Sequence, residues 1–121
     1  MRETKLWSWH ILAGVFLFVL LGAHMCTMHL DEVLGKLAGA REGLEVLSFG
    51  AVADRASPAT AAFYFLFAGA ALYHGLYGLR NILCELTTKE SLKKALGSAI
   101  VVVGVVLFAY GAYAAVASAS L

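Results

Sequence analysis

Residues 6–30 read LWSWHILAGVFLFVLLGAHMCTMHL, and this stretch contains no Asp, Glu, Lys or Arg. Two more uncharged stretches follow at residues 56–79 and 95–121. A helix that spans a bilayer needs roughly 20 predominantly apolar residues, and each stretch is long enough. The 121-residue chain is 61% hydrophobic and only 14% charged, whereas a soluble domain has about 25% charged residues. The sequence therefore predicts an all-α membrane protein with three transmembrane helices.

The predicted helices, at about residues 6–30, 58–83 and 95–117, account for most of the chain, so we expect one membrane-anchor domain over residues 1–121. This plan leaves no room for a water-soluble catalytic domain, and any activity then needs the bilayer or partner subunits. The formal net charge of +1 shows no excess of basic residues of the kind that binds nucleic acid. The longest polar connection, residues 31–57, has apolar residues at spacings of three and four that allow a short interfacial helix.

Local signals predict where the helices begin and end. Asp31 and Glu32 are expected to close the first helix at the membrane boundary. Pro58 is expected to begin the second helix, because proline suits the first helical position. Thr88 or Ser91 is expected to cap the third helix with a side-chain oxygen.

The distribution of lysine and arginine predicts the orientation, since short cytoplasmic connections carry an excess of these residues. The side that holds the N-terminus and the second connection has six of them: Arg2, Lys5, Arg80, Lys89, Lys93 and Lys94. The first connection has three: Lys36, Arg41 and Arg55. The sequence therefore predicts an N-terminus inside and a C-terminus outside.

Histidines within the predicted helices are the candidate site residues, because an intramembrane imidazole normally faces a partner, a cavity or a metal. His74 lies six residues before Arg80, which is roughly 9 Å from the inner charged end at about 1.5 Å per residue. His24 lies near the outer end of the first helix, while His10 lies at its inner end. His74 and His24 are thus expected to be too far apart for one haem, and each would need a further ligand from another polypeptide. The residues alone also allow these histidines to bond only to neighbouring helices.

The second helix carries a family signature. Residues 71–86 read ALYHGLYGLRNILCEL, which resembles the second helix of the cytochrome b membrane-anchor subunits of succinate dehydrogenase and fumarate reductase. In that family a Tyr-His pair is followed by Gly, Arg and usually Asp at fixed spacings. Here Tyr73 and His74 are followed by Gly78 and Arg80 at those spacings, and Glu85 replaces the Asp. The resemblance implies that His74 is an axial ligand of haem b near the cytoplasmic face, and that Arg80 lies near the haem propionates and the quinone pocket.

The first helix supports the same resemblance. It opens with Trp-Ser-Trp, and His10 precedes Gly14 by four residues, as the first histidine does in family members. This likeness relates His10 to the family's quinone site, although Ile11 stands where relatives often carry arginine. In two-haem members a further histidine follows the glycine by ten residues, as His24 does here. The resemblance therefore implies that His24 ligates a second, distal haem iron.

Together these features predict a haem-b anchor subunit of a succinate:quinone oxidoreductase or fumarate reductase, non-catalytic alone and multi-pass in the cell's inner (cytoplasmic) membrane. The resemblance implies a heteromeric helix bundle formed with a second membrane-anchor subunit, and docking of iron–sulfur and flavoprotein subunits. The complex would hold one or two haems b and exchange electrons with a membrane quinone, either menaquinone or ubiquinone. Membrane lipid surrounds such a chain. Two alternatives are a cofactor-free three-helix scaffold or small transport subunit, and a haem-b anchor of another quinone-linked dehydrogenase.

Overall fold

The fold is all-helical throughout the part of the chain that the structure, a computed structural model, describes: residues 2–37 and 49–120. Its helices are α1 (Arg2–Leu37), α2 (Phe49–Arg55), α3 (Pro58–Glu85) and α4 (Glu90–Ala119). Three helical segments are long and apolar enough to cross a membrane, namely Arg2–Leu30, Pro58–Glu85 and Glu90–Ser118. The prediction of an all-α chain with three candidate membrane spans is therefore confirmed.

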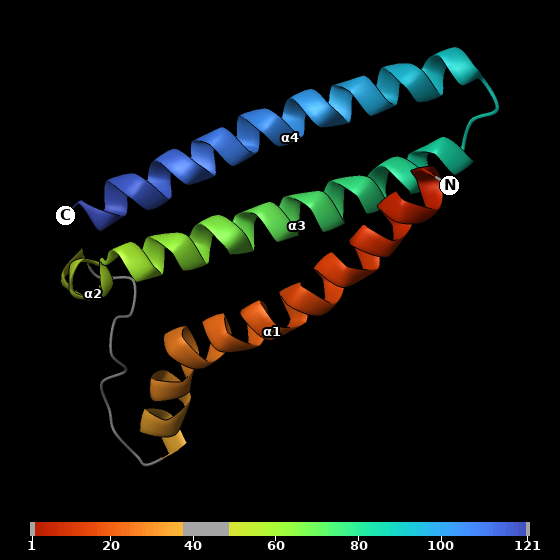
Figure 1. Cartoon of the computed structure of the whole chain (residues 1–121). Helices are drawn as coiled ribbons and strands as arrows, with labels where there is room; N and C mark the ends of the chain where they lie inside the picture. The colour runs from red at the N-terminus through yellow and green to blue at the C-terminus, as the bar shows by residue number, and fades with distance from the viewer. Residues whose placement is uncertain (1, 38–48, 121) are drawn as a thin grey trace.

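Helix α3 is the central element, because it packs against both α4 and α1. Figure 1 shows α4 running antiparallel to α3, while α1 is closest to α3 near the N-terminus and diverges from it toward Leu37. The N-terminus and the α3–α4 connection lie at one end of the molecule, and α2 and the C-terminus lie at the other. This arrangement places the two polar ends on opposite sides of a long apolar middle.

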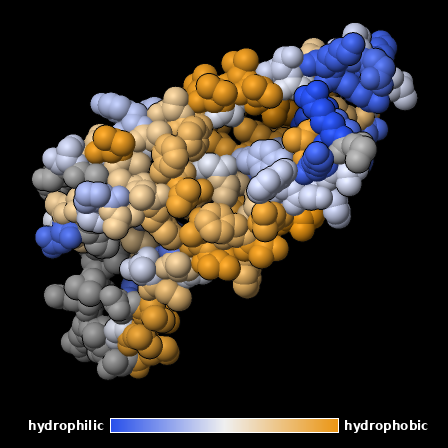
Figure 2. Space-filling view, viewed as in Figure 1, coloured by the Kyte–Doolittle hydropathy of each residue, from blue (hydrophilic) through white to orange (hydrophobic). Residues whose placement is uncertain are grey.

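Hydrophobic side chains cover the outside of the helices. Within the described residues Ala115 is the one buried hydrophobic residue, whereas Phe18 is 82% exposed and Trp9 is 62% exposed. Figure 2 shows apolar residues over the middle of the molecule and hydrophilic residues gathered at the end near the N-terminus. A soluble monomer rarely exposes apolar patches of such extent, and lipid or partner helices would cover this surface in a membrane.

The start of α3 matches its predicted signal. Pro58 lies at the first helical position, where its missing N–H costs no hydrogen bond. Ser57 is the N-cap, and its side-chain oxygen accepts a hydrogen bond from the backbone N–H of Thr60 at 3.1 Å. Such a cap satisfies one of the backbone N–H groups that a helix start leaves without a partner.

Two predicted boundaries are wrong. Helix α1 continues through Asp31 and Glu32 to Leu37, because leaving the apolar stretch does not itself end a helix, and Glu32 pairs with Lys36 one turn later. Helix α4 is not capped by a side chain of Thr88 or Ser91. Its N-cap is Lys89, which makes no side-chain capping bond, and the acidic Glu90 in the first turn instead complements the helix dipole.

A short interfacial helix was predicted within the connection at residues 31–57, and the structure describes the end of this connection that leads into α3. There the seven-residue helix α2 precedes α3. Residues 38–48, which contain several of the apolar residues on which the prediction rested, lie outside the described residues.

Candidate functional site

The imidazole of His74 points from α3 toward α1 and is held by the α1 backbone. Its Nδ1 atom lies 3.0 Å from the carbonyl oxygen of His10. Because a carbonyl oxygen only accepts hydrogen bonds, Nδ1 carries the proton in this contact, and Nε2 keeps a free lone pair. Histidines that bind metals commonly use their other ring nitrogen in this way. His74 is thus oriented with Nε2 able to act as a ligand.

The rings of His10 and His74 stack on each other. Their centroids are 4.2 Å apart and their planes differ by 4°, and the centroid of the Tyr77 ring lies 5.2 Å from that of His10. Both histidines are expected from the sequence to lie in the same half of the membrane, but their contact was not predicted. We refer to these two residues as the His10–His74 pair.

Two glycines make this close approach possible. A Cβ atom on Gly14 would lie 2.8 Å from Cε1 of His74, and a Cβ atom on Gly78 would lie 3.4 Å from Cε1 of His10. Each glycine is four residues, about one helical turn, after the histidine of its own helix. In the antiparallel helices α1 and α3 (Figure 1), this spacing sets each imidazole against the glycine of the opposite helix.

Two further glycines lie at the contact between α3 and α4, and two others have no close neighbour in the described chain. A Cβ atom on Gly69 would meet the ring of Phe108 at 3.3 Å, and one on Gly104 would meet Leu76 at 2.9 Å, so both support close packing of α3 against α4. Gly22 and Gly75 have no such neighbour within 4 Å in the described chain.

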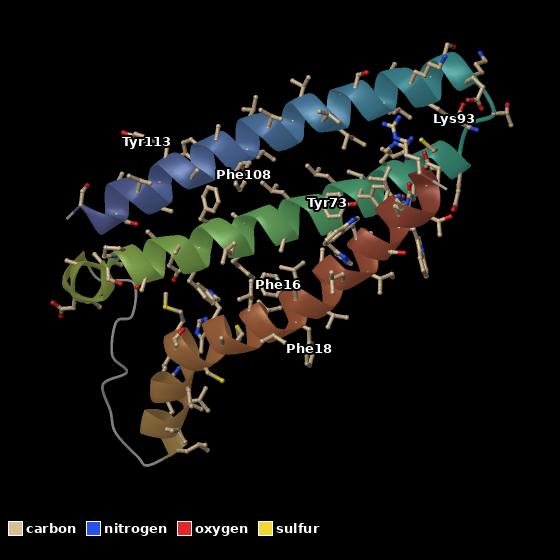
Figure 3. The ribbon with its side chains drawn as sticks, viewed as in Figure 1. Phe16, Phe18, Tyr73, Lys93, Phe108 and Tyr113 are labelled. Atoms are coloured by element: carbon tan, nitrogen blue, oxygen red, sulfur yellow. The ribbon has the colours of Figure 1, made fainter. Side chains whose placement is uncertain are left out.

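Tyr73 ties the start of α1 to α3 beside the His10–His74 pair. Its hydroxyl donates a hydrogen bond of 2.9 Å to the carbonyl oxygen of Leu6. Figure 3 shows the Tyr73 side chain near this end of α1. Together with the bond from His74 to the His10 carbonyl, it fixes the relative position of the two helices.

A second histidine site lies further along the contact between α1 and α3. The ring of His24 stacks on Phe67 at 5.7 Å and meets the edge of Tyr64 at 5.9 Å. Its Nδ1 atom is buried and has no hydrogen-bond partner among the described residues. His24 follows His10 by fourteen residues on α1, a rise of about 21 Å at 1.5 Å per residue. We call His24, Tyr64 and Phe67 the His24 cluster.

Arg80 occupies a different surface of α3. Its Nε atom lies 3.6 Å from the position that a Cβ atom on Gly97 of α4 would take. Its Nη1 donates a hydrogen bond of 3.3 Å to the side-chain oxygen of Asn81. The guanidinium is therefore directed toward α4, whereas His74 is directed toward α1.

The described residues contain no group of three or more His, Cys, Asp or Glu side chains that could hold a metal ion. The candidate site consists instead of single imidazoles on the contact between α1 and α3. Three apolar helices long enough to span a bilayer, with imidazoles on the contact between two of them, define the class of multi-pass helical membrane proteins.

Comparison with known proteins identifies the family. The chain belongs to the succinate dehydrogenase/fumarate reductase transmembrane subunit family, whose model matches residues 2–113. A curated relative, the succinate dehydrogenase hydrophobic membrane anchor subunit of Thermoplasma acidophilum, is 30% identical over 99 residues, which cover 81% of this chain and 72% of that protein. No solved structure matches the chain. The chain is thus a multi-pass membrane-anchor subunit of this family, and an anchor subunit implies partner subunits in its complex.

Proposed function

We propose that this chain is the haem-b-binding membrane anchor of a succinate:quinone oxidoreductase or fumarate reductase, and that His74 is an axial ligand of the haem iron. The observation that carries the proposal is the hydrogen bond from Nδ1 of His74 to the His10 carbonyl. This bond leaves Nε2 as the free nitrogen and fixes the plane of the ring, as metal-bound histidines require. Gly14 supplies the space in which the ring lies.

The second ligand of the same iron would come from another polypeptide. The His10 ring lies parallel to the His74 ring at 4.2 Å, so these two stacked imidazoles would not hold one haem iron between them. His24 is about 21 Å further along α1. We therefore propose a heteromeric helix bundle, in which a second membrane-anchor subunit packs on the exposed apolar surface and supplies the opposite ligand.

We further propose that His24 ligates a second haem b. Its buried Nδ1 lacks a partner in the described chain, as does that of His10, and an unsatisfied buried nitrogen is costly unless a group from outside the chain meets it. Phe67 and Tyr64 provide an aromatic wall beside the ring. Haem stoichiometry tests this assignment: two haems per complex, falling to one in His24→Ala, support it, whereas one haem per complex in the unmutated protein rejects it.

The bound haem would supply one-electron transfer between an iron–sulfur subunit and a membrane quinone, menaquinone or ubiquinone, because iron held by two imidazoles has no open position for other chemistry. The residues of this chain orient the imidazoles and keep them in an apolar surrounding. The excess of lysine and arginine at the end with the N-terminus favours a cytoplasmic position for that end in the cytoplasmic membrane, where the iron–sulfur and flavoprotein subunits would dock. The contact of Arg80 with a haem propionate or quinone, and that of His10 with quinone, stay predictions of the family resemblance.

The decisive experiment is a reduced-minus-oxidised optical spectrum of the purified complex. We expect an α-band of b-type haem that is lost or shifted in His74→Ala and unchanged in the matched control His29→Ala, whose side chain is exposed. Because cofactor binding stabilises the folded complex, His74→Ala can reduce assembly. His74→Met then provides a second variant, which should retain haem with a shifted potential through its thioether.

Each contrary result favours a specific alternative. Full haem content with an unchanged spectrum in His74→Ala rejects the ligand assignment. Absence of any b-type α-band in the unmutated complex favours a cofactor-free scaffold or transport subunit. A b-type spectrum with copurified subunits other than a flavoprotein and an iron–sulfur protein favours another quinone-linked dehydrogenase.

A further inference from the structure

A groove runs between α3 and α4, and residues of the first turns of α1 line the end of it that lies at Arg80. Its volume is about 670 Å³, within the range of roughly 300–1,000 Å³ that is usual for small-ligand sites. Along α3 it extends from Gly69 to Arg80, which is roughly 17 Å of helix. In Figure 3 the ring of Phe108 lies between α4 and α3 and forms part of the wall at the Gly69 end. The groove is therefore a long apolar slot of the right size for a chain-like ligand.

The other end of the groove is cationic. Arg80 and Arg2 line it together with one acidic residue, Glu3. Arg80 is half-buried, and its hydrogen bond to Asn81 uses one of the five N–H donors of a guanidinium. In the described part of the chain no carboxylate lies within ion-pair distance of Arg80. A cation in such a position within a membrane protein is costly unless an anion meets it.

We propose that this groove binds one acyl chain of an anionic phospholipid, with the lipid phosphate held by Arg80 and Arg2. The apolar slot matches the hydrocarbon chain, and the cationic mouth matches the phosphate, with which a guanidinium forms paired, charge-assisted hydrogen bonds. A quinone ring is neutral and would leave the charge of Arg80 unmet. This assignment replaces the contact of Arg80 with a haem propionate or quinone that the family resemblance implies, while the ligation of haem by His74 proposed above does not depend on it.

The surroundings of the mouth favour the same class of ligand. Lys93, which pairs with Glu90 at 2.9 Å, lies at this end of α4 (Figure 3), and Lys89 and Lys94 are its neighbours in the sequence. Basic residues clustered next to a membrane span attract anionic lipid headgroups. This end of the groove therefore lies where anionic headgroups would concentrate.

Gly97 keeps the mouth open beside the guanidinium. A Cβ atom at this position would make ordinary contact with Nε of Arg80, at 3.6 Å. A larger side chain would extend into the space next to the guanidinium that the phosphate is proposed to occupy. Gly97→Leu therefore tests the site without removing its charge, and Arg80→Gln tests the charge without filling the groove.

The experiment titrates phosphatidylglycerol into the purified, delipidated complex and counts bound lipids by native mass spectrometry, with haem content measured in the same samples. The unmutated complex should bind phosphatidylglycerol in preference to phosphatidylcholine. Loss of a charge-assisted contact in Arg80→Gln should weaken this binding roughly ten-fold or more, and Gly97→Leu should weaken it as well. Lys36→Gln, which removes a cation of α1 outside the groove lining, and Val103→Leu, an exposed position of α4 outside the lining, should bind as the unmutated complex does.

Three outcomes would overturn the proposal. Equal binding of phosphatidylcholine and phosphatidylglycerol would show that the charges of Arg80 and Arg2 do not select an anionic lipid. Displacement of the lipid by added quinone at equal concentration would assign the groove to quinone. Loss of haem with full lipid binding in Arg80→Gln would assign the guanidinium to a haem propionate. Should Arg80→Gln fail to assemble, Gly97→Leu decides, and a complex without any haem would contradict the proposed function while leaving the lipid result valid.

Discussion

Replacement of Gly14 by alanine should disturb the proposed haem site through a single methyl group. The added Cβ would lie 2.8 Å from Cε1 of His74, closer than carbon atoms normally approach, so either the His74 ring or helix α1 must move. Overpacking of this kind costs about 1–3 kcal/mol, and the ring movement also strains the hydrogen bond to the His10 carbonyl. Under the proposed function, this energy reduces the affinity for haem by roughly 5- to 150-fold, at about 1.4 kcal/mol per factor of ten.

The assay is the haem content of the purified complex together with the position of its α-band. Gly22→Ala is the matched control, because it lies on the same helix and an added Cβ there meets no atom within 4 Å in the described chain. Both substitutions gain the same helix propensity of about 1 kcal/mol, so the difference between them reports the contact with His74. Equal haem content and identical spectra of the two variants would refute the reasoning.

Three further predictions follow from other contacts. Gly78→Ala should have a smaller effect on haem content than Gly14→Ala, because its added Cβ would lie 3.4 Å from the neighbouring imidazole; an equal effect would contradict the ranking. Tyr73→Phe removes the hydroxyl bond to the Leu6 carbonyl and should lower stability in denaturing detergent by about 0.5–1.5 kcal/mol without changing the haem spectrum. The hydrogen bond from Lys36 lowers the pKa of the Glu32 carboxyl. The pair therefore stabilises the last turn of α1 fully above the usual carboxyl pKa, and this stabilisation is lost as the pH falls through the lowered pKa. The protection of this turn, measured as amide exchange relative to the intrinsic exchange rate at each pH, should then fall at acidic pH, and Lys36→Gln should remove this pH dependence of the protection.

The three spans were predictable because the bilayer restricts the possible structures so strongly. Without water, backbone N–H and C=O groups must be satisfied within the segment, and an uncharged stretch of sufficient length becomes a helix. The end of α1 was not predictable on the same basis. Beyond the membrane, Glu32 and Lys36 are good helix formers that pair with each other, so the charges that mark the membrane boundary continue the helix to Leu37.

The contact between His10 and His74 was missed for a different reason. In a helix that is apolar on all sides, the hydrophobic pattern does not reveal which face meets a neighbour. The sequence did contain a signal, since a glycine follows each of these histidines by four residues. It becomes informative only when α1 and α3 are known to be antiparallel neighbours, because each glycine then accommodates the imidazole of the other helix.

The two histidine sites lie on one continuous contact and yet should behave independently. His10 and His24 are fourteen residues apart on α1, nearly four full turns at 3.6 residues per turn, and both rings pack onto α3. Their separation of about 21 Å fits within a hydrocarbon core of about 30 Å. Mutations more than about 10 Å apart with no shared partners usually have additive effects on stability. His24 contacts Tyr64 and Phe67 rather than His74. Under the proposed function, a partner subunit that covers this contact would complete two haem sites, and the loss of one site in His24→Ala should leave the spectrum of the other intact.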